Sequence, residues 1–129
     1  MIGVEVVFGL GVDIISTRKV RDAIETAGKP FLDEVYTPQE QWQAKVHPNP
    51  LNYLAMIFAA KEAIFKTFAI GWETGVELTE IDIITGESGE PIPLLKGTFR
   101  DLVSKRGATK VSLSLSCDNE FALAVAMLV

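Results

Sequence analysis

The sequence predicts an α+β protein, because helix-type patterns fill its first half and strand-type patterns fill most of its second half. One apolar run near the N-terminus is the exception and is typical of a strand. The chain has 129 residues, of which 48% are hydrophobic, which is enough to bury a substantial core. We therefore expect a single domain over residues 1–129, in which an antiparallel sheet packs on a long central helix.

The first two elements expected along the chain are a strand and a helix. Residues 3–12 form a largely apolar run that is typical of a strand buried on both faces. Residues 16–30 place apolar side chains at helical spacing along one stripe. Gly28 and Pro30 are expected to end this helix, because glycine favours helix C-termini and proline cannot continue a helix.

Two more helices are expected before the pattern changes. Thr37 and Glu40 enclose a sequence with the form of a capping box, with proline at the first helical position, so a helix is expected to begin there and to end near residue 47. Residues 51–70 are apolar on almost every side. This pattern is typical of a central helix that is buried against its neighbours.

The second half of the chain favours strands. Alternating and apolar segments separated by turn residues predict two hairpins with a short helix between them. The last strand is apolar throughout, so we expect it in the middle of its sheet, whereas the strand before it alternates serines with apolar residues. The expected elements are strands at 78–85 and 92–95, a helix at 98–107, and strands at 110–116 and 121–129 joined by a turn at 117–120.

Composition limits the class of partner and the compartment. The net charge of −5 disfavours nonspecific binding to nucleic acid or to anionic membranes. The single cysteine, Cys117, excludes an internal disulfide. No apolar run reaches the roughly 20 residues of a membrane-spanning helix, and Glu5 with no preceding basic segment argues against a signal peptide. We expect a cytoplasmic protein that binds neither nucleic acid nor membrane.

The stretch GLGVDI, residues 9–14, places one acid among apolar residues. A dinucleotide-binding turn is rejected, because that fingerprint requires a third glycine where this chain has Ile14. Asp13 then has two interpretations. It ends the strand or caps the following helix, for which Ser16 and Thr17 are equally suited, or it serves a functional site.

Glu62 and Lys66 stand four residues apart in the expected central helix and so share one face. On a solvated surface such a pair contributes about 0.3–0.5 kcal/mol. Here the rest of the helix is nearly devoid of polar side chains, so their face is expected to open onto a cleft. A cation held by Asp13 and Glu62, with a phosphate at Lys66, would compensate charges that apolar walls disfavour.

Several segments together resemble the holo-acyl-carrier-protein synthase family of 4'-phosphopantetheinyl transferases. The resemblance covers nearly the whole chain in the right order. Its most specific parts are the N-terminal G-x-G-x-D and the K-E-A-x-x-K element of the central helix. The segments that carry it are GLGVDI, FAAKEAIFKTF, IDIITGESGEP and LSLSCDNEFALAVAML.

The resemblance implies a fold, a reaction and a set of site residues. The reaction is the Mg²⁺-dependent transfer of phosphopantetheine from coenzyme A to a serine of an acyl carrier protein, which releases adenosine 3',5'-bisphosphate. The family pattern maps the metal ligands onto Asp13 and Glu62 and a coenzyme A phosphate contact onto Lys66, which makes these three the catalytic residues. Glu62 and a water molecule bound to the metal both remain candidates for the base. Family members commonly form homotrimers with active sites between subunits.

Further binding residues are expected on either side of this site. The family's first helix offers basic residues to an acidic carrier protein, which matches Arg18, Lys19 and Arg21; the alternative is a solvated basic face. Ser114 and Ser116 are candidates for hydrogen bonds to coenzyme A phosphates if their strand lines the cleft, and otherwise they form its solvent face. Cys117 occupies the coenzyme-site position of a family histidine. No catalytic histidine pattern accompanies this cysteine, so we do not expect a nucleophile.

Four departures from the family pattern affect the coenzyme site. Besides Cys117, Ile57 replaces an arginine, Ala69 and Ile70 replace a glycine and a threonine, and Glu90 replaces a lysine. Each lost charge-assisted hydrogen bond to phosphate weakens binding by about 1.5–3 kcal/mol. Two functional classes follow: an active transferase, or a noncatalytic or weakly active relative that binds a carrier protein or a nucleotide without transfer.

Overall fold

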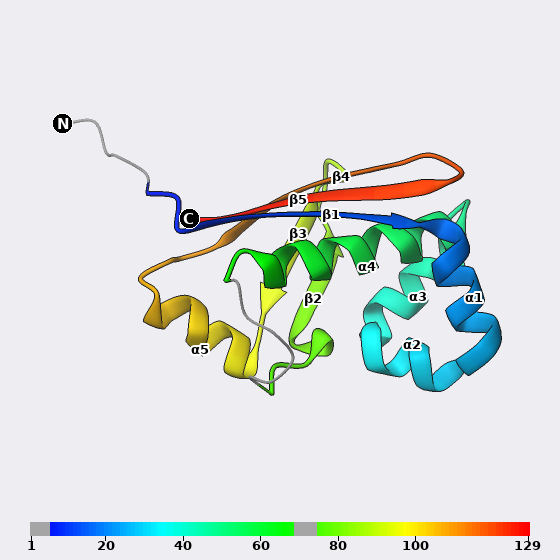
Figure 1. Ribbon diagram of the computed structural model, residues 1–129, viewed down its shortest axis with the longest axis horizontal. Coiled ribbons are helices and arrows are strands. Elements are labelled where there is room, and N and C mark those ends of the chain that lie inside the picture. Colours follow the sequence, from blue (N-terminus) through cyan, green and yellow to red (C-terminus); the bar gives the residue numbers. More distant parts are fainter. Residues whose placement is uncertain (1–5, 69–74) are drawn as a thin grey trace.

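The computed structural model describes residues 6–68 and 75–129, and it confirms the α+β class (Figure 1). Most helices precede most strands, as the sequence predicts. No helix in these two ranges is long and apolar enough to cross a membrane. The elements in chain order are β1 (Gly9–Ser16), α1 (Thr17–Ala27), α2 (Lys29–Val35), α3 (Pro38–Val46), α4 (Pro50–Lys66), η2 (Leu78–Glu80), β2 (Ile81–Thr85), β3 (Pro91–Leu95), α5 (Gly97–Lys105), β4 (Val111–Cys117) and β5 (Phe121–Leu128).

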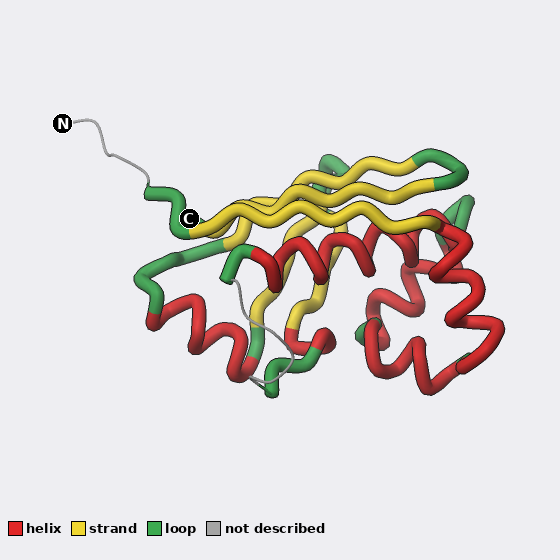
Figure 2. Tube along the Cα trace, in the orientation of Figure 1, coloured by secondary structure: helices red, strands yellow, loops and turns green. Residues whose placement is uncertain are grey.

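The strands form two antiparallel sheets. The larger sheet has the order β1-β5-β4, so the apolar strand β5 is central, as predicted, and the smaller sheet is the hairpin β2-β3 (Figure 2). Register places Asp13 opposite Ala124 and Val12 opposite Val125. Because side chains alternate across a strand, Asp13 and Ala124 share one face of the sheet, and Val12 and Val125 share the other.

Helix α4 covers one face of the larger sheet, and α1, α2 and α3 gather at one end of this helix (Figure 1). Asn49 caps α4 by accepting a hydrogen bond from Asn52 N, and proline occupies its first turn. The alanines of β5 that face α4 are fully buried, whereas the side chains on the opposite face are exposed. The core therefore lies between α4 and the sheet, and the other face of the sheet has no covering layer in the described chain.

The two glycines of GLGVDI allow α4 to approach β1 closely. A Cβ atom at Gly11 would collide with the carbonyl oxygen of Ala63, and one at Gly9 would collide with that of Thr67. Two residues along a strand span about the same length as four residues along a helix. The contact of Gly11 with Ala63 is therefore repeated by the contact of Gly9 with Thr67. The G-x-G spacing is thus a packing requirement, and it places the next residue of the same face, Asp13, towards α4.

A buried ion pair joins α4 to the other helices and to β2. Lys61 Nζ donates hydrogen bonds to Glu40 Oε1 (2.6 Å) and to Val35 O (2.7 Å), and both charged side chains are fully buried. Glu40 also accepts from the backbone N–H groups of Thr37 and Ile83. Burial raises the pKa of Glu40 and lowers the pKa of Lys61, and the opposite charge of each counteracts these effects.

The sequence interpretation of this pair was incomplete. The capping box at Thr37 and Glu40 is confirmed. However, the capping pattern carries no information about a lysine 21 residues further on, and Lys61 was considered only as the first lysine of the K-E-A-x-x-K element. The backbone bonds and the lysine together satisfy a carboxylate that burial alone would disfavour.

The strand predicted at 3–12 is confirmed at residues 9–12 but has other bounds, and its residues 3–5 lie outside the described residues. The strand begins at Gly9 and continues to Ser16, so Asp13 lies within β1 instead of ending it. Nor does Asp13 cap the next helix, because the Ser16 side chain accepts the hydrogen bond from Arg18 N. The two glycines were considered only as part of a dinucleotide-binding turn, whereas here they allow the close approach of a helix.

Helix α2 was not predicted. Gly28 ends α1 with φ of 61°, as expected, and its N–H donates to Ile24 O. Pro30, however, occupies the first turn of α2, where its missing N–H costs nothing. The proline that was interpreted as a stop for one helix is also the start of the next.

Other boundaries also differ from those predicted. The strand predicted at 78–85 begins only at Ile81, because residues 78–80 form the 3₁₀-helix η2. Helix α4 ends at Lys66, before the expected end at residue 70, and residues 69 and 70 lie outside the described residues. Cys117 is the last residue of β4, paired with Ala122, instead of the first residue of the turn.

Substituting Gly11 with alanine tests the close contact between β1 and α4. We expect Gly11→Ala to lower the free energy of unfolding by about 1–3 kcal/mol, because the added methyl group overlaps a backbone oxygen that cannot rotate away. The measurement is urea unfolding followed by circular dichroism at one fixed protein concentration. Val46→Ala, at an exposed position of α3, is the control. Equal stability of Gly11→Ala and wild type would contradict the contact.

Candidate active site

Asp13 lies on the face of β1 that meets α4, and Lys66 lies in the last turn of α4 beside it. Lys66 Nζ donates hydrogen bonds to Asp13 Oδ1 (3.0 Å) and to Val12 O (3.0 Å). The Asp13 side chain is 16% exposed and the Lys66 side chain 54%. Lys66 therefore neutralises Asp13 in this structure, and its charged end keeps access to solvent.

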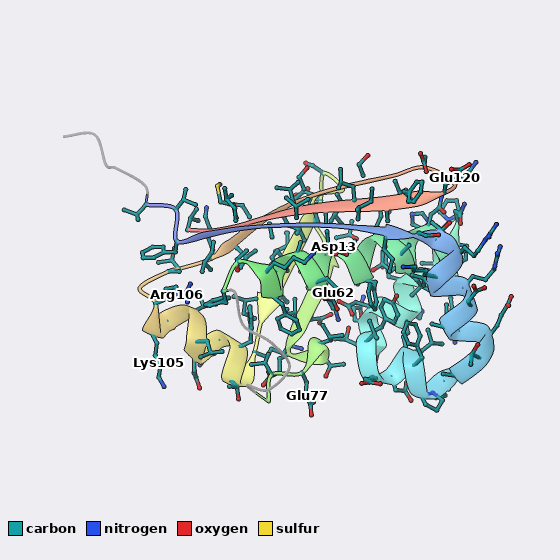
Figure 3. All side chains as sticks on the ribbon, viewed as in Figure 1. Asp13, Glu62, Glu77, Lys105, Arg106 and Glu120 are labelled. Carbon is teal, nitrogen blue, oxygen red and sulfur yellow. The ribbon has the colours of Figure 1, made fainter. Side chains whose placement is uncertain are left out.

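Glu62 lies one helical turn before Lys66, on the same side of α4. Figure 3 shows Glu62 on α4 and Asp13 on the adjoining strand. Burial raises the pKa of the Glu62 carboxyl, the nearby Asp13 charge raises it further, and Lys66 lowers it. The two carboxylates are therefore close enough to repel each other, although 49 positions separate them in the chain.

Asp13 and Glu62 share a cavity of about 400 Å³, here called the carboxylate cavity. The prediction that Asp13 and Glu62 converge on one cleft is supported by this lining. In residues 6–68 and 75–129, no group of three or more His, Cys, Asp or Glu side chains is arranged to hold a metal ion. The lining residues are Asp13, Ile14, Ile15, Ser16, Lys19, Phe58, Glu62 and Phe121.

Sequence reasoning missed the two aromatic residues of this lining. Phe58 precedes Glu62 by four residues on α4, a spacing that could have indicated a shared face. Phe121 is brought to the cavity by the pairing of β1 with β5, in which it lies opposite Ser16. Nothing in the local sequence around Phe121 signals that long-range pairing.

The three predicted carrier-binding residues, Arg18, Lys19 and Arg21, are all exposed on α1 but divide between two cavities. Lys19 lines the carboxylate cavity. Arg18 and Arg21 line a neighbouring cavity of about 410 Å³, here called the basic cavity. It is completed by Ser16, Thr17, Asn119, Glu120 and Phe121. The cations thus extend from the acidic site to the adjacent surface.

The predicted coenzyme residues of β4 do not join the carboxylate cavity within one chain. Ser114 pairs with Val125 and Ser116 pairs with Leu123, so both serines point away from α4. Both are exposed, as is Cys117 at the end of the strand. The assignment of these three residues to coenzyme binding stays a prediction, and it requires a neighbouring chain to complete the site.

The departures from the family pattern have local structural roles where they are described. Ile57 is buried and lines a cavity of about 290 Å³ together with His47 and Tyr53. Glu90 Oε2 accepts a hydrogen bond from Ser88 N, within the turn that joins β2 to β3. Ala69 and Ile70 lie outside the described residues. An isoleucine and a turn-bound carboxylate offer no positive charge to a phosphate.

Comparison with known proteins agrees with this arrangement. A family model described as the 4'-phosphopantetheinyl transferase superfamily matches residues 9–126. The chain therefore belongs to the 4'-phosphopantetheinyl transferase superfamily, and the resemblance and the enzyme class predicted from the sequence are confirmed.

Individual relatives cover almost the whole chain. It is 34% identical over 116 residues to the holo-acyl-carrier-protein synthase of Halothermothrix orenii, covering 90% of this chain and 92% of that protein. The crystal structure of holo-acyl-carrier-protein synthase from Neisseria meningitidis matches with a TM-score of 0.88 at 29% identity, covering 96% and 99% of the two chains. A synthase from Bacillus anthracis in complex with coenzyme A (3',5'-ADP) matches with a TM-score of 0.77 at 27% identity, covering 95% and 96%.

Removing the charge of Glu62 is expected to stabilise the protein at neutral pH. Its pKa is higher in the folded protein than in the unfolded chain, so ionisation of Glu62 costs folding stability as the pH rises. Glu62→Gln should therefore have a higher urea midpoint than wild type at pH 7. The difference should vanish below the ordinary glutamate pKa of about 4.3.

The control for this measurement is Glu25→Gln, which removes an exposed carboxylate from α1. It should leave the urea midpoint nearly unchanged at both pH values. A Glu62→Gln variant that is less stable than wild type at pH 7 would show that Lys66 outweighs burial and Asp13.

Proposed function

We propose that this chain is a holo-acyl-carrier-protein synthase, which transfers 4'-phosphopantetheine from coenzyme A to a serine of an apo acyl carrier protein. The serine oxygen forms a bond to the phosphorus that carries pantetheine, and the bond from that phosphorus to the leaving phosphate oxygen breaks. Adenosine 3',5'-bisphosphate leaves, and the serine proton passes to a base. The observation that carries the proposal is the convergence of Asp13, Glu62 and Lys19 at the carboxylate cavity, with Lys66 paired to Asp13.

The acids of the cavity fit a divalent cation. Asp13 and Glu62 repel each other, and burial disfavours the charged form of Glu62, so a cation would relieve both effects. Mg²⁺ in phosphate-transferring sites is commonly held by one or two carboxylates together with water and substrate phosphates. We propose that Asp13 and Glu62 hold Mg²⁺. When bound, it supplies positive charge that stabilises the pyrophosphate and the charge that develops on its leaving oxygen.

Lys66 supports this proposal because its side chain can leave Asp13 and bind another group. It is bonded to Asp13 in this structure, and its exposed end can turn to a phosphate when a cation takes its place at Asp13. Lys66 then contacts the coenzyme A phosphate. Because a cation favours the charged form of Glu62, we assign Glu62 the ligand role.

The cations of α1 support an acidic protein partner. The chain as a whole has a net charge of −5, so an acidic carrier needs a local basic surface. Arg18, Lys19 and Arg21 provide one, and Lys19 extends it into the carboxylate cavity. We propose that an acyl carrier protein docks on α1 with its acceptor serine directed to Asp13 and Glu62.

The exposed apolar face of the larger sheet supports a homotrimer. This outer sheet face, defined by Leu10, Val12, Ile14, Leu123 and Val125, has side chains that are 39% to 64% exposed. Contiguous apolar surfaces of this kind mark protein interfaces. Ser114 and Ser116 border it, so a copy seated there would lie beside these serines and bring a second chain to the coenzyme site.

A second function is favoured by the local roles of Ile57 and Glu90. Neither can neutralise a phosphate, so coenzyme A affinity is expected to be low, and a relative that binds a carrier protein or nucleotide without transfer is the alternative.

The transfer reaction distinguishes the two functions. Incubation of the protein with coenzyme A, Mg²⁺ and an apo acyl carrier protein should add phosphopantetheine to the carrier, detected by mass spectrometry of the intact carrier. Asp13→Ala and Glu62→Gln should each abolish the adduct, since each removes a proposed ligand. A wild-type protein that modifies no carrier while binding one would favour the alternative.

Calorimetry with Mg²⁺ separates metal binding from catalysis. Both variants should lose the heat of cation binding in the presence of coenzyme A, whereas Glu25→Gln should retain it. Unchanged binding in Asp13→Ala and Glu62→Gln would refute the ligand assignment.

A charge placed on the outer sheet face tests the trimer. Val125→Lys should convert a trimer to a monomer in sedimentation equilibrium, because the charge would be buried without a partner. Val46→Lys, at an exposed position of α3, should remain trimeric. A monomeric wild-type protein would contradict the proposed assembly.

A further inference from the structure

The cavity of about 290 Å³ beside α3 and α4, here called the neutral cavity, brings together the described positions at which this chain departs from the family pattern. Ile57 lines it directly, and both chain neighbours of Glu90 line it. Leu115 also lines it, and Cys117 follows two residues later on the same face of β4. These positions are far apart in the chain, so their meeting around one cavity indicates that they act on one part of a ligand.

The polar groups of the neutral cavity carry no permanent charge. They belong to Gln43, His47, Tyr53 and Thr85, and no lysine, arginine or acid is among the described residues of the lining. His47 Nδ1 accepts a hydrogen bond from Asn49 N (3.0 Å), and its ring packs on Tyr53 with the ring centroids 5.4 Å apart. Such a lining suits a heterocyclic base and a hydroxyl group, whereas a phosphate would lose water there without gaining a cation.

The turn that joins β2 to β3 adds negative charge beside the neutral cavity. Residues 86–90 of this turn include Glu87 and Glu90 and no basic residue. The Glu90 carboxylate is held in the turn, because its Oε2 accepts a hydrogen bond from Ser88 N (2.9 Å) and its Oε1 lies over Gly86, where a Cβ atom would collide with it. These carboxylates would repel a phosphate in the neutral cavity.

Coenzyme A carries three phosphates, and the proposed function assigns the two of its pyrophosphate to Lys66 and the carboxylate cavity. The third is the 3'-phosphate of the ribose, next to the adenine. We propose that the neutral cavity receives the adenosine of the donor with a free 3'-hydroxyl, so that 3'-dephosphocoenzyme A serves this chain at least as well as coenzyme A. This inference rests on the proposed function. It also requires a donor that reaches from one chain to the next, because the two cavities share no lining residue.

The transfer from this donor breaks the same bond as the transfer from coenzyme A. The oxygen of the carrier serine forms a bond to the phosphorus that carries pantetheine, and that phosphorus loses its bond to the bridging oxygen of the pyrophosphate. Adenosine 5'-monophosphate leaves with that oxygen, and the serine proton passes to a base. The missing 3'-phosphate takes no part in these steps.

Initial rates with each donor, Mg²⁺ and one apo acyl carrier protein test this selection. In wild type, kcat/KM for 3'-dephosphocoenzyme A should equal or exceed kcat/KM for coenzyme A. Glu90→Lys should raise kcat/KM for coenzyme A about tenfold through a charge-assisted hydrogen bond to the 3'-phosphate, and should leave the value for the other donor within about twofold. Glu90→Gln keeps an acceptor for Ser88 N and should raise the coenzyme A value about threefold by removing repulsion.

The control is Glu34→Lys, which makes the same change of charge at an exposed position of α2 outside both cavities. It should leave the ratio of the two kcat/KM values unchanged. Calorimetric titration with the nucleotide products separates recognition from transfer. Adenosine 5'-monophosphate should bind wild type at least as tightly as adenosine 3',5'-bisphosphate, and Glu90→Lys should reverse this order.

The outcomes separate the donor selection from the proposed function. A preference of wild type for coenzyme A by more than about threefold in kcat/KM, or identical donor ratios in wild type, Glu90→Gln and Glu90→Lys, would overturn the role of the neutral cavity and leave the proposed function in place. The expected order of nucleotide binding without transfer from either donor would overturn only the proposed function. A wild-type protein that binds neither nucleotide and transfers from neither donor would overturn both.

Discussion

Helix α4 lies so close to strand β1 that no side chain fits between them at two positions. Gly9 and Gly11 face the carbonyl oxygens of Thr67 and Ala63, and the rest of the candidate site depends on this contact. It sets how far Asp13 stands from the helix that carries Glu62 and Lys66. A larger separation would weaken the interaction between the two carboxylates, and a rotation of α4 would remove Glu62 from their shared cavity.

The site is built at a cost to folding stability. Asp13 and Glu62 repel each other, and Glu62 is charged in partly buried surroundings. Lys66 offsets part of this by bonding to Asp13. Charge groupings that a folded chain tolerates poorly are typical of functional sites, because a ligand of opposite charge is needed to complete them. The two carboxylates thus suit a cation, and Lys66 suits a phosphate that binds with it.

The sequence predicted local chemistry better than long-range geometry. The capping box at Thr37, the apolar strand β5 in the middle of its sheet and the meeting of Asp13 with Glu62 all follow from patterns or from the family resemblance. Helix α2 was missed because Pro30 both follows one helix and begins another.

Other features could not have been found from local patterns. The register of β1 depends on its pairing with β5 and on its contact with α4, neither of which is encoded by nearby residues. The same holds for Phe121, which reaches the carboxylate cavity and the basic cavity through that pairing. The division of Arg18, Lys19 and Arg21 between these cavities likewise depends on how α1 is oriented relative to the sheet.

The buried pair of Lys61 and Glu40 fixes the rotation of α4 from a side of the helix that does not face the site. Neighbouring residues on a helix point about 100° apart, so Lys61 is directed to α3 and β2 while Glu62 is directed to β1. Two contacts therefore orient α4: the ion pair with Glu40 and the close packing against β1. The orientation of α4 depends on Glu40, at the start of α3, as much as on β1. The position of Glu62 in the carboxylate cavity therefore depends on an ion pair that is fully buried.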